Sequence, residues 1–185
     1  MRKKLYLCAL IWQSAEINKS TLYINPTEDR GTGISTHPHP KSQNNLKTMK
    51  PTHIEHLGIA VTSLEEAMPF FEFLTGGKCY SIEEVADQKV KTAFFKVGEV
   101  KIELLEATSP ESSIAKFIEK NGGKGGIHHV AFNVDSVEEA LAEAEAAGIQ
   151  LIDKAPRKGA ENLMIAFLHP KSTKGILTEL CEQPK

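Results

Sequence analysis

The chain of 185 residues is poor in cysteine and aromatic residues and has no large excess of charge of either sign. Its three cysteines, Cys8, Cys79 and Cys181, are odd in number, far apart and in no CxxC pair. This pattern excludes a disulfide framework and a cysteine-rich zinc site, and it indicates reduced thiols. A formal net charge of −2 gives no reason to expect a nucleic acid or a membrane surface as a partner.

Long apolar runs and phosphate-binding loops are also missing. No apolar run approaches the roughly 20 residues that a transmembrane helix needs. No GxxxxGK[ST] loop is present. The hydrophobic fraction of 41% and the charged fraction of 25% are those of a soluble globular protein. We therefore expect a cytoplasmic protein with one ordinary domain, or with two small units that share a core.

The first 48 residues differ from the rest of the chain. A basic start followed by the apolar stretch Leu5–Trp12 has the look of a short signal peptide, but the residues after it make a poor cleavage site. From Asn25 to Thr48 the composition is polar and Pro-, Gly- and Ser-rich, without periodicity. We expect residues 1–48 to be a disordered or non-native extension, and residues 49–185 to form the folded domain.

What the chain does contain is an internal repeat. The segment Ile54–Val61 matches Ile127–Val134 at an offset of 73 residues, which places His56 on His129. Each unit also ends in a β-like run that holds one glutamate, Glu103 in the first and Glu179 in the second. A duplicated module that supplies one imidazole and one carboxylate from each copy predicts a four-ligand metal site at the seam between the halves.

Both units show the same alternation of strand and helix. Ser63 with Glu66, and Ser136 with Glu139 at the same offset, form capping boxes that predict a helix after the first strand of each unit. Further strands are expected at residues 78–85, 90–97 and 100–105, and then at 151–154, 163–168 and 175–181.

Between the units, Thr108 and Glu111 predict a third capping box and a linker helix over Pro110–Asn121. The fold class that follows is α+β with two tandem βαβββ modules. Module one covers residues 53–107, the linker helix 108–124 and module two 125–182.

Strand alternation supports the metal site, because side chains two residues apart share a face. His129 then points away from His128, so we expect no metal role for His128 and none for His53, which lies outside the repeat. Glu103 and Glu179 each share a face with apolar neighbours, where an ionised carboxylate is costly to bury without a partner. A divalent cation explains both, and imidazole with carboxylate suits zinc, cobalt, nickel or iron.

Four motifs carry a resemblance to a known family. The chain from about His53 to Glu182 resembles the vicinal-oxygen-chelate (glyoxalase-type) superfamily, and within it the methylmalonyl-CoA epimerases. The most specific features are the Gly-Ile-His-His strand and the His-Pro-Lys-Ser run before the last glutamate. The motifs are Ile54–Val61, Ser109–Phe117, Gly125–Phe132 and Phe167–Leu180.

This resemblance implies a curved mixed sheet shared by the two modules, with metal ligands at His56, Glu103, His129 and Glu179. It implies a divalent metal ion as the cofactor, cobalt first, with zinc, nickel and manganese as alternatives. It further implies an acyl-CoA substrate, a homodimer and a place in propionate metabolism.

The reaction implied by the resemblance interconverts (R)- and (S)-methylmalonyl-CoA. Its acidic hydrogen lies between a thioester and a carboxylate, so proton removal gives an enolate that a divalent ion would stabilise. Epimerisation then needs acid/base groups on two opposed sides. Our hypothesis is that Glu103 and Glu179 are these two catalytic groups.

Three alternatives remain open on the same scaffold. A glyoxalase-like lactoylglutathione lyase shares the metal and the enolate chemistry, and an extradiol-type dioxygenase would need a 2-His-1-carboxylate site. A ligand-binding resistance protein would have a cavity lined by aromatic residues and no metal. For the CoA phosphates, Lys171, Lys174 and Arg157 are candidates, although solvated loop charges are an equal interpretation.

Overall fold

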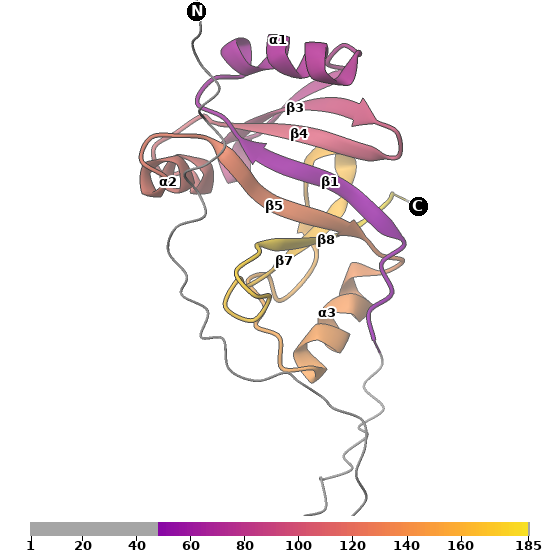
Figure 1. Cartoon of the computed structure of the whole chain (residues 1–185). Helices are drawn as coiled ribbons and strands as arrows, with labels where there is room; N and C mark the ends of the chain where they lie inside the picture. The colour runs from indigo at the N-terminus through magenta and orange to yellow at the C-terminus, as the bar shows by residue number, and fades with distance from the viewer. Residues whose placement is uncertain (1–47, 185) are drawn as a thin grey trace, which may run out of the picture. The chain divides into compact units, whose positions relative to one another are not determined.

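The computed structural model describes residues 48–184, so the expectation for residues 1–47 lies outside the described part of the chain. The first half contains β1 (His53–Ala60), α1 (Leu64–Thr75), β2 (Ser81–Val85), the 3-10 turn η1 (Ala86–Gln88), β3 (Val90–Val97) and β4 (Val100–Ala107). After α2 (Ser113–Lys120), the second half contains β5 (Gly126–Asn133), α3 (Val137–Ala146), β6 (Arg157–Lys158), η2 (Ala160–Asn162), β7 (Met164–Leu168) and β8 (Thr178–Glu182) (Figure 1).

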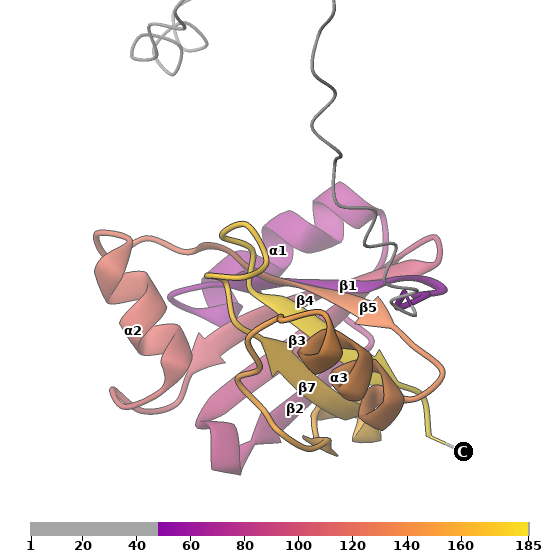
Figure 2. The same ribbon diagram turned by 90° about the horizontal axis from the view of Figure 1, so that it is seen from below.

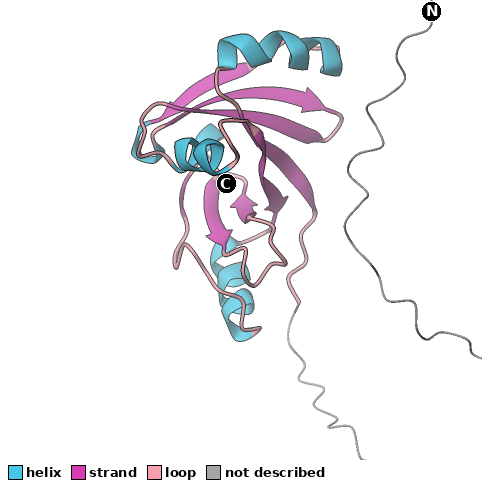
Figure 3. Ribbon diagram, turned by 60° about the vertical axis from the view of Figure 1, so that its left-hand side comes forward, coloured by secondary structure: helices cyan, strands magenta, loops and turns pink. Residues whose placement is uncertain are grey.

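The eight strands form one mixed sheet in the order β2-β3-β4-β1-β5-β8-β7-β6. The two halves meet where β1 pairs antiparallel with β5, while β4 and β8 lie parallel on the outer sides of this pair. Figure 3 shows the strands curling around a concave face. The predicted α+β fold of two repeated modules on a shared, curved mixed sheet is confirmed.

The helices α1 and α3 begin as the capping boxes predict. The Ser63 hydroxyl accepts a hydrogen bond from the Glu66 N–H, and Ser136 accepts one from the Glu139 N–H, each at 3.3 Å. Gly76 ends α1 in the left-handed conformation with φ of 68°, which glycine adopts at little cost. Matching caps at matching offsets are the clearest structural sign of the repeat.

A second pair of caps links these helices to the strands of the site. The Glu106 carboxylate accepts from the Leu64 N–H at 2.6 Å, and the Glu182 carboxylate accepts from the Val137 N–H at 3.0 Å. Both glutamates stand near the end of β4 or β8 and carry negative charge to a helix N-terminus, which the helix dipole favours. Each helix is thereby tied to the strand that carries its module's predicted site glutamate.

The linker helix is shorter than predicted. α2 begins at Ser113, and its cap is Ser112, whose hydroxyl accepts from the Ile114 N–H at 3.2 Å. The predicted capping box at Thr108 is wrong, because the Thr108 N–H donates to the Lys89 carbonyl and extends the pairing of β3 with β4. Figure 2 shows α2 beside one end of the sheet.

The predicted strand over residues 151–154 is also reduced. Leu151 makes only an isolated bridge to Leu168, and the paired segment is β6 further along the chain. The Asp153 carboxylate accepts from the Phe167 N–H at 2.9 Å, so a side chain takes the place of a ladder carbonyl. This local hydrogen bond competes with strand pairing and explains the difference.

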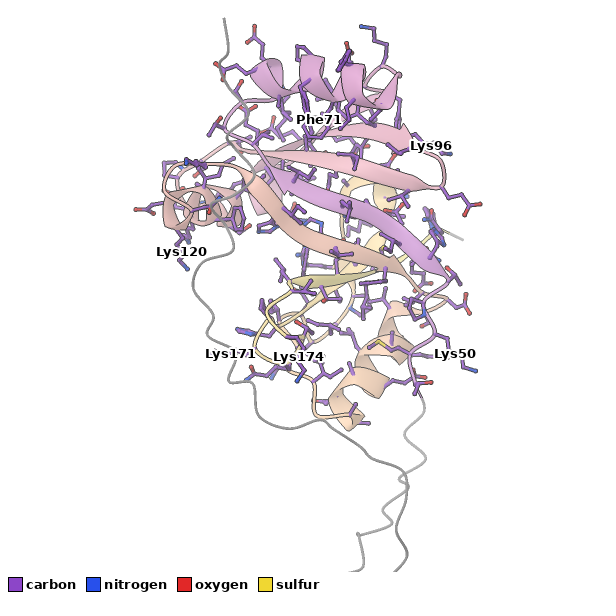
Figure 4. All side chains as sticks on the ribbon, viewed as in Figure 1. Lys50, Phe71, Lys96, Lys120, Lys171 and Lys174 are labelled. Carbon is purple, nitrogen blue, oxygen red and sulfur yellow. The ribbon has the colours of Figure 1, made fainter. Side chains whose placement is uncertain are left out.

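The hydrophobic core lies between the sheet and the two long helices. Under α1, Phe71 points toward the sheet and packs against the fully buried Phe95 (Figure 4). Under α3, Leu141 packs with Leu168 and Leu180 in the equivalent cluster. These layers cover one face of the sheet and leave its concave face free of α1 and α3. Within residues 48–184 no helix is long and apolar enough to cross a membrane.

Candidate metal centre

Two β-bulges at the seam aim the polar side chains. Along the antiparallel pair of β1 and β5, the register shifts once at Glu55 and once at His128, so each strand holds one extra residue. A bulge breaks the two-residue alternation and re-aims the side chains beside it. The two extra residues stand at equivalent places of the repeat, directly before His56 and His129.

The bulges correct one prediction from the sequence. His128 does not point away from the site, because it lines the same cavity as His129, and the Nδ1 atoms of the two rings are 3.0 Å apart. Burial lowers the pKa of His128 to about 4, with a further contribution from the charge of His129. His128 is therefore a neutral imidazole in the wall of the site. His53 contacts the exposed Thr52 hydroxyl, outside the site.

The structure brings together the four side chains that the repeat singled out, and each is no more than 5% exposed. The Nε2 atoms of His56 and His129 are 2.9 Å apart. One Glu103 oxygen lies 3.3 Å from His56 Nε2 and 3.6 Å from His129 Nε2. One Glu179 oxygen lies 3.7 Å and 3.0 Å from the same two atoms. Two imidazole nitrogens and two carboxylates thus converge on one buried point.

The electrostatics of the four groups are coupled. Burial raises the pKa of the Glu103 carboxyl, and the charges of His56 and His129 offset this only in part. Burial also works to raise the pKa of the Glu179 carboxyl, but the nearby His129 and His56 rings outweigh it and hold this pKa well below the usual range. Burial opposes the charged form of His56, yet the nearby carboxylates of Glu179 and Glu55 raise its pKa to about 10. Imidazolium charge therefore compensates the buried carboxylates.

The donor set fits a divalent cation. Nitrogen and oxygen ligands about 2.0–2.2 Å from a shared ion lie about 2.8–3.6 Å from one another in octahedral or tetrahedral geometry. The separations between the imidazole nitrogens and their neighbours here run from 2.9 to 3.7 Å. His56, Glu103 and His129 alone already place three ligand atoms within 4.8 Å of one another. A cation would take over the charge compensation that a proton on His56 otherwise provides.

A cavity of about 220 Å³ opens above the four groups on the concave face. Most of its wall is apolar, and α2 closes one end of it through Ile114. The apolar wall comes from both modules and from α2, and it includes Val85, Val90, Phe94, Leu105, Ile114, Ile152, Leu163, Ile165, Phe167 and Leu177. A few converging polar groups at the floor of an apolar cavity are typical of a small-molecule site.

Comparison with known proteins agrees with this geometry. Residues 55–167 match the Glyoxalase/Bleomycin resistance protein/Dioxygenase superfamily. The chain belongs to this superfamily. An uncharacterized protein of Bacillus subtilis (strain 168) is 43% identical over 129 residues, covering 70% of this chain and 91% of the relative. A mitochondrial methylmalonyl-CoA epimerase of Dictyostelium discoideum is 35% identical over 130 residues, covering 70% of this chain and 78% of the relative.

A solved structure in the superfamily extends the likeness to three dimensions. A Streptomyces coelicolor methylmalonyl-CoA epimerase variant in complex with 2-nitronate-propionyl-CoA matches with a TM-score of 0.69 and 33% identity. The match covers 72% of this chain and 96% of that chain. The likeness therefore spans nearly the whole length of the solved epimerase.

Sequence reasoning missed a buried charge network behind His56. The Glu55 carboxylate accepts from His56 Nδ1 at 2.5 Å and pairs with Lys101 through its other oxygen. Lys101 also pairs with Glu161, which accepts from the Tyr80 hydroxyl at 3.1 Å. Burial works to raise the pKa of Glu55, but its hydrogen bonds to His56 and Lys101 prevail and lower it. Strict alternation places Glu55 and His56 on opposite faces of β1, and only the bulge at Glu55 lets both side chains be buried together. The sequence pattern therefore gave no sign of this contact.

This network orients His56. A carboxylate only accepts, so in the neutral ring the proton stays on Nδ1 and the Nε2 lone pair faces the other three groups. Such partners behind a ligand typically raise metal affinity 10- to 100-fold. We expect Glu55→Gln to weaken Co²⁺ binding to the full chain by about 10- to 100-fold in isothermal titration calorimetry. Glu84→Gln, an exposed change on β2, is the control. Unchanged affinity in Glu55→Gln would remove the orienting role.

Neither of the two lysines that were candidates for binding the CoA phosphates lines the cavity. Lys171 and Lys174 are exposed on the loop between β7 and β8, where Figure 4 labels them. Arg157 does line the cavity, and its guanidinium lies 5.5 Å over the Phe167 ring. Lys171 and Lys174 therefore fit the alternative interpretation, that they are solvated loop charges, whereas Arg157 does not.

Proposed function

We propose that this protein is a metal-dependent epimerase that interconverts (R)- and (S)-methylmalonyl-CoA. The observation that carries the proposal is the placement of Glu103 and Glu179 on either side of the histidine pair, at the floor of an apolar cavity. The relatives add support, because several of them are named methylmalonyl-CoA epimerases, and one solved complex holds an acyl-CoA compound.

In this proposal His56, Glu103, His129 and Glu179 hold the divalent ion, with cobalt as the first candidate. When bound, the ion would polarise the thioester oxygen and stabilise the negative charge that develops on the substrate. The apolar wall excludes water and strengthens each electrostatic interaction at the floor. The Glu55–Lys101 pair keeps His56 in one orientation throughout.

The two glutamates would move the proton. Because β4 and β8 lie outside β1 and β5, Glu103 and Glu179 approach the centre from opposite sides. One carboxylate takes the hydrogen from the α-carbon as a proton and leaves an enolate. The other carboxyl group, which already holds a proton, donates that proton to the opposite face of the same carbon, so the two groups exchange protonation states in each turnover. Glu103 is the better candidate to swing free, because its nearest imidazole nitrogen lies at 3.3 Å, whereas Glu179 has one at 3.0 Å and the other at 3.7 Å.

The decisive experiment follows the α-hydrogen itself. The full chain is loaded with Co²⁺, and methylmalonyl-CoA is incubated with it in deuterated water. We expect deuterium to enter the α-position by NMR, at a rate that falls when the metal is removed with a chelator. No exchange, with turnover of the methylglyoxal–glutathione adduct instead, would replace the proposal by a lactoylglutathione lyase. Neither reaction, with tight binding of an aromatic compound, would favour a ligand-binding protein.

A further inference from the structure

Two buried polar atoms of the cavity have no partner. Among the described side chains, Thr92 Oγ1 and Arg157 Nη1 are the buried nitrogen and oxygen atoms that make no hydrogen bond. Both residues line the cavity above the candidate metal centre. A buried donor without an acceptor is destabilising, and such atoms in a native fold call for an explanation. A bound ligand that accepts from both would supply it.

Thr92 stands in an otherwise apolar part of the wall. It is 2% exposed on β3, opposite Leu105 of β4, and the next inward pair along these strands is Phe94 with Glu103. Its side chain therefore lies on the concave face, one step along the sheet from a candidate ligand. Nothing about strand packing requires the hydroxyl here, because valine has the same shape and favours strands more.

Arg157 is fixed so that one nitrogen remains free. Its Nε donates to the Asp153 carboxylate at 3.2 Å, and its guanidinium plane rests on Phe167. The Phe167 ring in turn meets the His129 ring edge to face at 5.4 Å. Arg157 is thus two contacts away from the candidate metal centre, with Nη1 buried at the cavity.

The segment after Arg157 contacts the strand pair that carries Thr92, so the two modules meet here. The Glu161 N–H donates to the Glu83 carboxylate at 3.0 Å, and Glu83 is the cross-strand partner of Thr92. Lys101 holds the Glu161 carboxylate from β4. The segment that carries Arg157 is therefore anchored over the end of the sheet where Thr92 lies, so both free donors belong to one end of the cavity.

We propose that Thr92 and Arg157 bind the free carboxylate of the acyl group, so that the cavity selects acyl thioesters that carry a second carboxylate. This inference rests on the proposed function, because it concerns the same site and substrate. A carboxylate offers only acceptor lone pairs, and a guanidinium N–H and a hydroxyl are two donors suited to them. Thr92 and Arg157 are specificity-determining residues in this account, and neither transfers a proton.

The test compares methylmalonyl-CoA with propionyl-CoA, which differ only by the carboxylate. Affinities are measured by isothermal titration calorimetry on the full, Co²⁺-loaded chain. We expect the preference for methylmalonyl-CoA to fall by about 10-fold in Thr92→Val and by about 10- to 100-fold in Arg157→Gln, with propionyl-CoA binding unchanged. The exposed residues Thr62, in the loop after β1, and Lys158, next to Arg157, provide the controls Thr62→Val and Lys158→Gln. Retention of the full preference in both test variants would overturn the inference.

The melting temperature of each variant shows whether a loss of preference comes from a loss of folded structure. In the ligand-free protein, Thr92→Val removes an unpaired buried hydroxyl, so its melting temperature is expected to rise by a few degrees. A lower melting temperature would mean that the hydroxyl has a structural partner, and the inference would fail. Arg157→Lys keeps the charge but loses the forked geometry and should recover only part of the preference.

Failure of the inference and failure of the proposed function are distinguishable. If the wild-type chain binds methylmalonyl-CoA preferentially but exchanges no α-hydrogen, the carboxylate subsite stands and the epimerase proposal fails. If the α-hydrogen exchanges but the variants keep the preference, the epimerase stands and the metal ion or other residues recognise the carboxylate.

Discussion

Replacing Glu179 by Gln is expected to lower the rate of methylmalonyl-CoA epimerisation by about 10²- to 10⁴-fold, the usual contribution of a positioned acid/base group. Glutamine keeps the shape of the side chain but cannot hold or release the proton. In the same assay Glu103→Gln should fall into the same range, because both sides of the α-carbon need a group that titrates. The measurement is the initial rate of epimerisation with the metal content of each variant determined in parallel.

Parallel metal analysis separates the two roles of these glutamates. If a variant has lost its Co²⁺, the rate loss belongs to the metal ligand, and the rate is compared again at saturating Co²⁺. Glu99→Gln, in the exposed turn between β3 and β4, changes the same chemical group without contact to the site and should leave the rate unchanged. Near-normal turnover of metal-replete Glu103→Gln would exclude it as a catalytic group and leave Glu179 to act alone.

Gly58→Ala is expected to disrupt the candidate metal centre without removing any ligand. Gly58 lies in β1 between Glu103 of β4 and His129 of β5, its partners on the two sides. A Cβ at this position would stand 2.1 Å from the His129 ring, far inside van der Waals contact. The ring must move or the strands must separate, and such overpacking typically costs about 1–3 kcal/mol of stability. Co²⁺ affinity should fall by more than 10-fold, because His129 leaves the other three groups.

Gly77→Ala is the matched control, since a Cβ there meets nothing closer than 4.0 Å. Co²⁺ titration and thermal unfolding of both variants would show the difference. If Gly58→Ala bound Co²⁺ as tightly as Gly77→Ala, the close approach of Gly58 to His129 would have no bearing on a metal site.

The short-range signals of the sequence were sufficient for much of the fold. Capping boxes at Ser63 and Ser136 depend on residues three apart, and both helices begin where these boxes stand. The capping prediction failed at Thr108, where the backbone N–H has a partner in a different strand. A local pattern is dependable as long as no distant segment competes for the same hydrogen-bonding groups.

The amino-acid sequence by itself determined the repeat, and with it the pairing of His56 with His129 and of Glu103 with Glu179, because equivalent positions of a duplicated module occupy equivalent places. The tertiary structure decided which other side chains join them. Whether a strand keeps its alternation depends on the register with its neighbour, which residues far apart in the chain set together. The bulges that bring Glu55 and His128 inside, and the cavity wall that isolates Thr92 and Arg157, exist only once β1, β3, β5 and β6 lie in one sheet.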